Sequence, residues 1–161
     1  MSAQGAGKLA SGLRLGGQIK QCEQALISEK QRVLRPFELT VPQYAAMLAL
    51  SETPRLSGAR LARRCGVSAQ AMNGVVALLD ERGLISRSRS EVHAKVLVIE
   101  LTSEGRALLR RADRAAVAVE RRLMESFSEA QLTVFREFLD TAIEALSGAR
   151  PERPWSASDF D

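Results

Sequence analysis

The residues best suited to chemistry in this sequence lie in a short unit around two glycines, Gly66 and Gly83. A helix break at Gly66 is followed by Ser68, whose hydroxyl can accept the first backbone N–H groups of a new helix. Gly83 ends that helix, since a residue free to adopt positive φ closes a helix. A glycine break before a Ser-capped helix is how a helix-turn-helix presents one helix to the major groove. The predicted chemistry is therefore DNA binding.

Candidate catalytic and metal-binding residues are scarce. The sequence has one histidine, His93, in a predicted loop, and two cysteines, Cys22 and Cys65, that form no CxxC pair. It contains no nucleophile motif, no metal-ligand cluster and no phosphate-binding loop. We therefore expect no enzyme, no metal and no cofactor.

The composition of the chain also favours a DNA-binding protein. The formal net charge of +4 favours a polyanionic partner. Aromatic residues make up only 4% of the chain, so the core must consist mainly of Leu, Val and Ala, as helix packing favours. No apolar run approaches the length of a membrane span, and the polar N-terminus lacks the apolar region of a signal peptide. We expect no membrane partner and a cytoplasmic location.

The elements around the reading helix follow from changes in periodicity. After Gly83 the pattern changes from helical to strand-like, because residues 96–101 form a β-branched apolar run. Residues 84–89 lead into this run through a polar loop, and together they predict a two-stranded wing. Thr40 with Gln43 has the capping-box pattern that begins a helix. The predicted fold class is mainly α, a winged helix-turn-helix with six helices and a two-stranded β-wing.

Amphipathic helices flank this unit on both sides. Their apolar stripes have helical spacing and include Leu15, Ile19, Leu132, Phe135, Leu139 and Ile143. A unit this small cannot cover such stripes, so we expect N- and C-terminal helices of two chains to pack as a symmetric homodimer. The two reading helices would then lie about one DNA turn apart and match a palindromic operator.

The chain divides into five predicted segments. We expect a flexible N-terminus at 1–12 and an N-terminal dimerisation helix at 13–36. A winged helix-turn-helix DNA-binding domain follows at 37–102, then C-terminal dimerisation helices at 103–148. The tail at 149–161 contains two prolines and three acids and is predicted to be flexible.

Several motifs resemble the MarR family of bacterial winged-helix regulators. They are Leu39-Thr40 with Pro42-Gln43-Tyr44, Leu61-Ala62-Arg63-Arg64 before Gly66-Val67-Ser68, Glu81-Arg82-Gly83-Leu84-Ile85, and Leu101-Thr102 followed by Glu104-Gly105. The resemblance covers residues 13–147 and includes the order of helices and wing strands. It implies a homodimeric transcription factor that represses by binding DNA and is released by a small molecule.

The resemblance also implies which residues read bases. The family's recognition helix begins at the position of Ser68 and uses the next turn and a half, here including Gln70, Met72 and Asn73. Glutamine and asparagine can each make a paired donor–acceptor contact with adenine. Ser68 can bond a phosphate as well as cap the helix.

Basic residues beside this helix are expected to contact the DNA backbone and the minor groove. An ungapped alignment places Arg87 at the foot of the wing and Lys95 where the family has its wing-tip arginine. A cation there gains from the negative potential of a narrow A·T groove. Arg64 and Arg89 are the other expected contacts. His93 stands where many relatives carry aspartate, so the usual wing signature is incomplete.

The recognition helix also departs from the family. It has no basic residue between Ser68 and Glu81, and Gly74 and Leu78 occupy positions where many relatives carry arginine. We therefore expect modest affinity and a salt dependence set by few phosphate contacts. The same departure leaves open a winged-helix interaction module that binds protein rather than specific DNA.

Family effectors are typically phenolic acids, bound between the DNA-reading lobe and the dimer helices. That resemblance implies ligand contacts at Tyr44 and Met47 and a small anionic or aromatic effector. Six arginines between Arg106 and Arg122 could also line an anionic pocket, but a solvated helix face and dimer salt bridges explain most of them.

A cysteine-based, redox-responsive repressor is a further alternative. One branch of the family senses peroxides through a cysteine in its first helix, several residues upstream of the position of Cys22. Because Cys22 lies on the apolar stripe, we expect a small buried hydrophobe rather than a sensor. Cys65 stands where relatives place a core leucine, so we expect inert packing there too.

Overall fold

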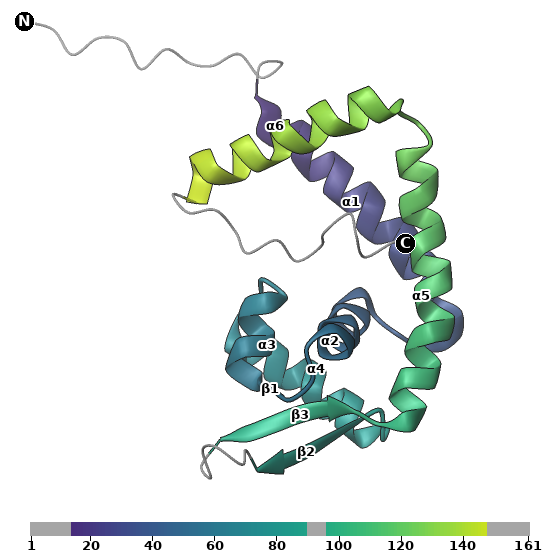
Figure 1. Ribbon diagram of the computed structural model, residues 1–161, viewed down its shortest axis with the longest axis vertical. Helices are drawn as coiled ribbons and strands as arrows, with labels where there is room; N and C mark the ends of the chain where they lie inside the picture. The colour runs from purple at the N-terminus through teal and green to yellow at the C-terminus, as the bar shows by residue number, and fades with distance from the viewer. Residues whose placement is uncertain (1–13, 90–95, 148–161) are drawn as a thin grey trace, which may run out of the picture.

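The chain folds into a small lobe that one long helix joins to two crossing helices (Figure 1). This computed structural model describes residues 14–89 and 96–147, and in them it has six α-helices, a short 3-10 helix and three strands. The elements are α1 (Leu15–Leu34), η2 (Arg35–Phe37), α2 (Val41–Glu52), β1 (Leu56–Ser57), α3 (Gly58–Arg64), α4 (Ala69–Glu81), β2 (Ile85–Arg89), β3 (Leu97–Leu101), α5 (Ser103–Met124) and α6 (Glu129–Ser147). The predicted fold class is confirmed, while the segments predicted to be flexible, 1–12 and 149–161, lie outside the described residues.

Side-chain caps begin the helices where the sequence predicts. The Thr40 hydroxyl accepts the Gln43 backbone N–H at 3.3 Å, and the Gln43 side-chain oxygen accepts the Thr40 N–H at 2.9 Å. The Ser68 hydroxyl caps α4 by accepting the Ala71 N–H at 3.1 Å. These bonds satisfy backbone donors that have no partner inside the helix, which fixes where each helix starts.

The sheet has one strand more than the predicted wing. β2 and β3 pair antiparallel, with Ile85 opposite Leu101 and Arg89 opposite Leu97. The two-residue β1 pairs with the other edge of β3, with Leu56 opposite Ile99, so the strand order is β1-β3-β2. Leu56 is buried, and its anchoring in the core holds this short segment against β3. Two residues are too few to show a strand period in the sequence.

The core lies where the small lobe (α2, α3, α4 and the three strands) meets the C-terminal end of α1 and the first half of α5. Its largest fully buried side chains are Leu34, Leu39, Met47, Leu50, Leu61, Met72 and Leu79. Gly105 allows α5 to approach the lobe closely, because a Cβ at this position would lie 2.0 Å from the Leu84 carbonyl oxygen. The small lobe and the start of α5 therefore form one packed body.

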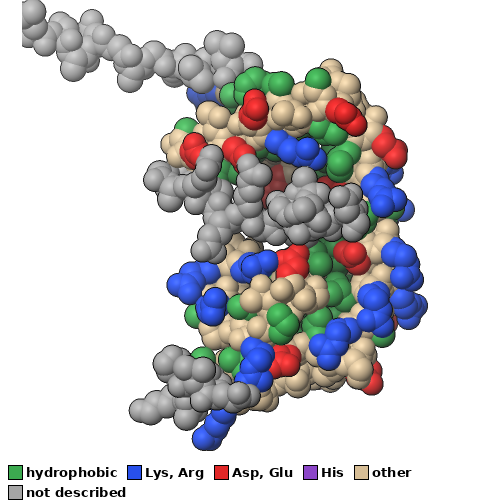
Figure 2. All heavy atoms as spheres, in the orientation of Figure 1, with side chains coloured by type: hydrophobic (Ala, Val, Ile, Leu, Met, Phe, Trp, Pro, Cys, Tyr) green, Lys and Arg blue, Asp and Glu red, His purple; other side chains and the backbone are tan. Residues whose placement is uncertain are grey.

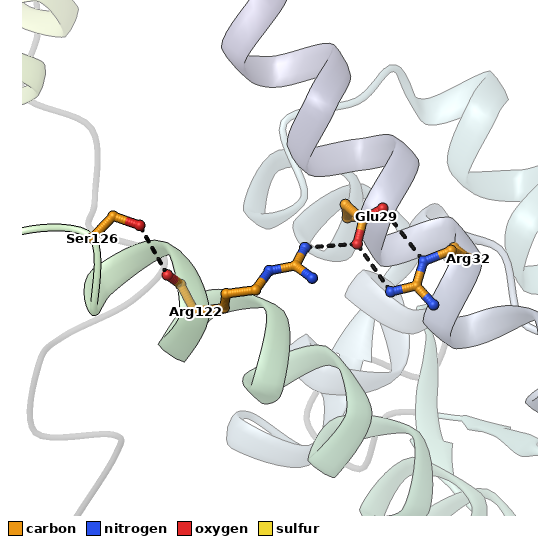
Figure 3. A network of polar contacts seen from close by, with 4 residues as sticks. All are labelled: Glu29, Arg32, Arg122 and Ser126. Atoms are coloured by element: carbon orange, nitrogen blue, oxygen red, sulfur yellow. Dashed lines mark hydrogen bonds and ion pairs between the residues drawn. The ribbon is translucent and has the colours of Figure 1, made fainter.

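Charged contacts join α1 to the C-terminal half of α5. Figure 3 shows Glu29 of α1 between Arg32 of the same helix, at 3.0 Å, and Arg122 of α5, at 2.7 Å. The Ser126 hydroxyl donates to the Arg122 carbonyl oxygen at 3.2 Å. Hydrogen bonds from the two arginines lower the pKa of Glu29 to about 2. The next residue of α1, Lys30, forms an ion pair with Glu120 of α5.

The last helix is packed far less than the others. None of residues 129–146 in α6 is buried within this chain. Its large apolar side chains are exposed, with Phe138 at 68% and Leu146 at 84% of full exposure. Across the segments that the structure describes, no helix has both the length and the apolar character that a membrane span requires.

Candidate DNA interface and effector cavity

The turn between α3 and α4 aims the N-terminus of α4 outward. Gly66 has a φ of +64°, a conformation that L side chains rarely adopt, and it ends the turn after α3. The structure then brings Ser68, Gln70 and Asn73 together on the exposed side of the first turns of α4. These three side chains form a polar surface that can offer hydrogen bonds to base edges or phosphates.

Met72 does not belong to that surface, and its prediction as a DNA contact is wrong. Its side chain is only 1% exposed, and it forms the inner stripe of α4 with Val76 and Leu79. Residues four and seven positions apart share one helix face, so burying Val76 and Leu79 carries Met72 into the core. The same spacing in the sequence was a signal that could have placed it there.

Two of the cations beside the reading surface already have partners in this chain. Arg87 on β2 forms an ion pair with Asp80 of α4 at 3.0 Å, and Arg64 pairs with Glu52. Arg89, further along β2, is exposed. The predicted wing residues Lys95 and His93 lie outside the described residues. A phosphate that approached Arg87 or Arg64 would have to compete with a carboxylate.

Arg82, at the end of α4, has a structural role. Its guanidinium donates to the carbonyl oxygens of Glu38 at 2.6 Å and Phe37 at 3.4 Å. Glu38 has a φ of +54°, so these bonds hold an unusual backbone conformation just before α2. Arg82 therefore ties α4 to the segment that connects α1 with α2.

A cavity of about 510 Å³ lies between the small lobe and the helical arm (α1, α5 and α6). Its lining residues are Leu26, Lys30, Tyr44, Leu48, Glu52, Asp113, Ala116, Val117, Glu120, Leu123, Met124, Phe127, Leu132, Phe135, Arg136 and Leu139. Tyr44 lines the cavity, and its role as a ligand contact stays a prediction. Met47 does not, because it is fully buried in the core, and its prediction as a ligand contact is wrong.

Tyr44 connects the two parts of the molecule across this cavity. Its hydroxyl, on α2, donates to a carboxylate oxygen of Asp113, on α5, at 2.7 Å. Burial and the neighbouring Asp113 carboxylate both raise the pKa of Tyr44 well above its usual value. The phenol therefore remains protonated and keeps donating to Asp113 throughout the physiological range.

The arginines of α5 do not contribute to the cavity. Arg106, Arg110, Arg111, Arg114, Arg121 and Arg122 are all exposed, and none of them lines the cavity. The interpretation that they line an anionic pocket is wrong. Asp113 and Glu120, seven residues apart on the inner face of α5, line it instead. Figure 2 shows a row of Lys and Arg side chains along the outer edge, where α5 runs.

A family model described as "MarR family" matches residues 37–95. The chain is 33% identical, over 132 residues, to the "HTH-type transcriptional repressor Rv2887" of Mycobacterium tuberculosis, covering 82% of this chain and 95% of that one.

The chain belongs to the MarR family.

Solved structures agree with this assignment. The crystal structure of the Mycobacterium tuberculosis MarR family protein Rv2887 with salicylic acid is 33% identical, covers 83% of this chain and 99% of that one, and has a TM-score of 0.65. The transcriptional repressor CouR bound to a 23-mer DNA duplex is 24% identical, covers 86% and 99% of the two chains, and has a TM-score of 0.75. The second likeness shows that the fold is shared.

The predicted dimer residues of this MarR chain lie on exposed or half-buried surface. Leu15 and Ile19 of α1 are 68% and 49% exposed. Phe135, Leu139 and Ile143 of α6 are exposed as well, and Leu132 is half-buried beside the cavity. Their role in a dimer stays a prediction.

The two cysteines of this MarR chain differ from each other. Cys22 is exposed, so the expectation that it is buried within the subunit is wrong. It lies on the α1 face that also carries Ile19. Cys65 is half-buried against the core, as predicted, and burial raises the pKa of its thiol, which disfavours the reactive thiolate.

Proposed function

We propose that this protein is a homodimeric transcriptional repressor that binds a palindromic operator through α4 and the wing. The observation that carries the proposal is the exposed cluster of Ser68, Gln70 and Asn73 on the outer face of α4, whose inner face is anchored in the core. Gln70 and Asn73 would hydrogen-bond adenine edges in the major groove, and Ser68 would bind a phosphate.

The flanking cations would supply most of the affinity for the DNA backbone. Arg89 and Lys95 would contact phosphates or the minor groove. Arg87 and Arg64 would exchange Asp80 and Glu52 for phosphate oxygens, and breaking those ion pairs opposes part of the gain. Few phosphate contacts for each subunit would make the loss of affinity with salt shallow.

The proposed dimer uses segments 13–36 and 103–148, while segment 37–102 reads DNA. The exposed apolar side chains of α1 and α6 support this arrangement, because a soluble monomer rarely exposes so many of them together. Two-fold pairing of these helices would place two copies of α4 on one face of the duplex, spaced for the two halves of a palindrome.

The cavity beside Tyr44 is the proposed effector site. Its mechanism would be a population shift, in which the effector favours a dimer whose α4 helices are spaced wrongly for the operator. The position of the cavity between the small lobe and the helical arm supports this, since a ligand there contacts both parts. The related repressor Rv2887 has been crystallised with salicylic acid, which supports an aromatic effector.

Fluorescence anisotropy of the protein against its own upstream promoter DNA and a scrambled duplex tests the proposal. We expect binding that is confined to the promoter, at one dimer per palindrome, and that weakens only gradually as salt rises. Asn73→Ala should weaken it by about tenfold, because a bidentate adenine contact is worth about 1–3 kcal/mol. Glu81→Gln, at the other end of α4, is the matched control. Equal, weak binding to both duplexes would contradict specific recognition at that promoter.

A protein-interaction module is the second candidate. The absence of basic residues between Ser68 and Glu81, together with the ion pair of Arg87, favours it over a strong DNA binder. The double variant Arg87→Ala with Lys95→Ala distinguishes the two functions. Operator binding is abolished in the repressor, whereas the same variant is nearly silent in a module that binds protein.

A further inference from the structure

We infer that the cavity beside Tyr44 binds a small aromatic cation, with its protonated amine against Asp113. The inference rests on the proposed effector site and adds the charge of its ligand. It departs from the anionic effector that the sequence suggests, because the lining carries three carboxylates, those of Glu52, Asp113 and Glu120, and two cationic side chains.

The orientation of α5 is the first observation behind this inference. The helix is rich in arginine, yet every one of its arginines is exposed and none lines the cavity. Its two inward acids, Asp113 and Glu120, are both half-buried. A ligand carboxylate inserted beside them would meet like charges in a medium that screens less than bulk water.

The second observation is which of these charges remains unpaired. Glu120 forms an ion pair with Lys30, and Glu52 forms one with Arg64. Among the residues that the structure describes, Asp113 has the Tyr44 hydroxyl as its hydrogen-bond donor and no cation as a partner. A carboxylate can accept several hydrogen bonds, so an ammonium can approach Asp113 without displacing Tyr44.

The groups that could attract an anion are less suitable. The Tyr44 hydroxyl already donates to Asp113, so it is not available to a ligand carboxylate. The Lys30 ammonium is held by Glu120. Arg136, the remaining cation of the lining, is on the exposed surface of α6, where water and salt weaken its attraction.

The other end of the cavity fits an aromatic body. Phe127 and Phe135 are stacked with their ring centroids 5.5 Å apart. Leu26, Leu123 and Leu132 complete an apolar wall around them. An aromatic ring can pack against apolar side chains of this lining while its amine meets the Asp113 carboxylate.

Three probes of similar size test the charge preference on the full-length protein. They are 1-naphthylmethylamine, which is protonated at neutral pH, the neutral 1-naphthylmethanol, and the anion 1-naphthoate. Isothermal titration calorimetry should show the amine binding at least about tenfold more tightly than either other probe, as expected for one charge-assisted hydrogen bond. Asp113→Asn should remove that preference, because the amide still accepts from Tyr44 but carries no charge.

Matched variants distinguish a direct contact with Asp113 from the overall electrostatic potential of the protein. Glu125→Gln removes one exposed charge from the C-terminal end of α5, outside the lining, and should leave the preference intact. Tyr44→Phe should keep or strengthen amine binding, because it frees the Asp113 oxygen that now accepts the phenol.

The possible outcomes separate this inference from the proposed function. Tighter binding of naphthoate, especially if Arg136→Gln abolishes it, overturns the cation preference and leaves the effector site standing. Equal binding of all three probes, or of none, also overturns the preference. Operator release is measured separately by anisotropy, so amine binding that depends on Asp113 without release supports the ligand class and contradicts the effector role.

Discussion

The small lobe and helix α6 differ in how far one chain satisfies its own apolar surface. The lobe buries side chains from each of its helices and strands in a continuous core. Helix α6 has a similarly regular apolar stripe, yet no side chain of residues 129–146 is buried. An amphipathic pattern therefore specifies a helix but not the surface that covers its apolar stripe. We expect the lobe to depend on contacts within the chain and α6 to depend on a second chain.

The largest expected effect breaks the lobe from the inside. Gly105→Ala would place a Cβ 2.0 Å from the Leu84 carbonyl oxygen, so α5 or the backbone before the wing must move. We expect a loss of about 3 kcal/mol in the free energy of unfolding, at the upper end for an overpacked core. Urea denaturation followed by circular dichroism measures it. A loss below about 1 kcal/mol would mean that α5 docks more loosely than this contact requires.

The second prediction concerns a variant that disrupts the proposed dimer contact of the helical arm and leaves the lobe unchanged. Ile143→Lys places a charge on the exposed apolar stripe of α6. We expect the dimer to dissociate, because a charge buried in an apolar interface without a partner is strongly unfavourable. Sedimentation velocity should show the monomer, while the circular dichroism spectrum stays helical. Glu137→Lys, outside the predicted stripe, is the control, and a variant Ile143→Lys that remains dimeric would place the interface elsewhere.

A third variant tests the stability and the DNA binding of the reading helix α4. Gly74 lies inside α4, and a Cβ built on it meets no atom within 4 Å. Gly74→Ala should therefore stabilise the lobe by about 0.5–1 kcal/mol, since glycine is unfavourable within a helix. Thermal unfolding measures this gain, and anisotropy measures the effect on DNA. A stabler protein with weaker operator binding would indicate that the missing Cβ serves close approach to DNA.

The smallest effect concerns the exposed charges that join α1 to α5. The pKa of Glu29 is lowered from 4.5 to about 2, first by hydrogen bonds from Arg32 and Arg122. Because the folded value lies below the unfolded one, the stabilisation is complete above the unfolded pKa and is lost as pH falls from 4.5 towards about 2. Glu29→Gln should be less stable than the natural chain at neutral pH, and the difference should shrink with acid and with salt. Urea midpoints measured across that pH range would contradict this if the difference stayed constant.

Several features could be predicted from sequence because they depend on neighbouring residues. The caps at Thr40 and Ser68 and the helix break at Gly66 depend on residues within one helical turn, so the residue types alone predict them. The burial of Met72 could have been predicted from its spacing with Val76, because residues four apart lie on one helix face. The family resemblance predicted a DNA contact at this position instead.

The sequence by itself therefore determined where the helices begin and end, the strand pair of the wing and the membership of a family. Tertiary structure alone decided which charges of α5 face the cavity, that Arg87 pairs with Asp80, and that Leu56 adds a third strand. The physical reason is range. Caps and periodicity act between residues a few positions apart, whereas ion pairs, cavities and strand pairing join residues that only the packed core brings together.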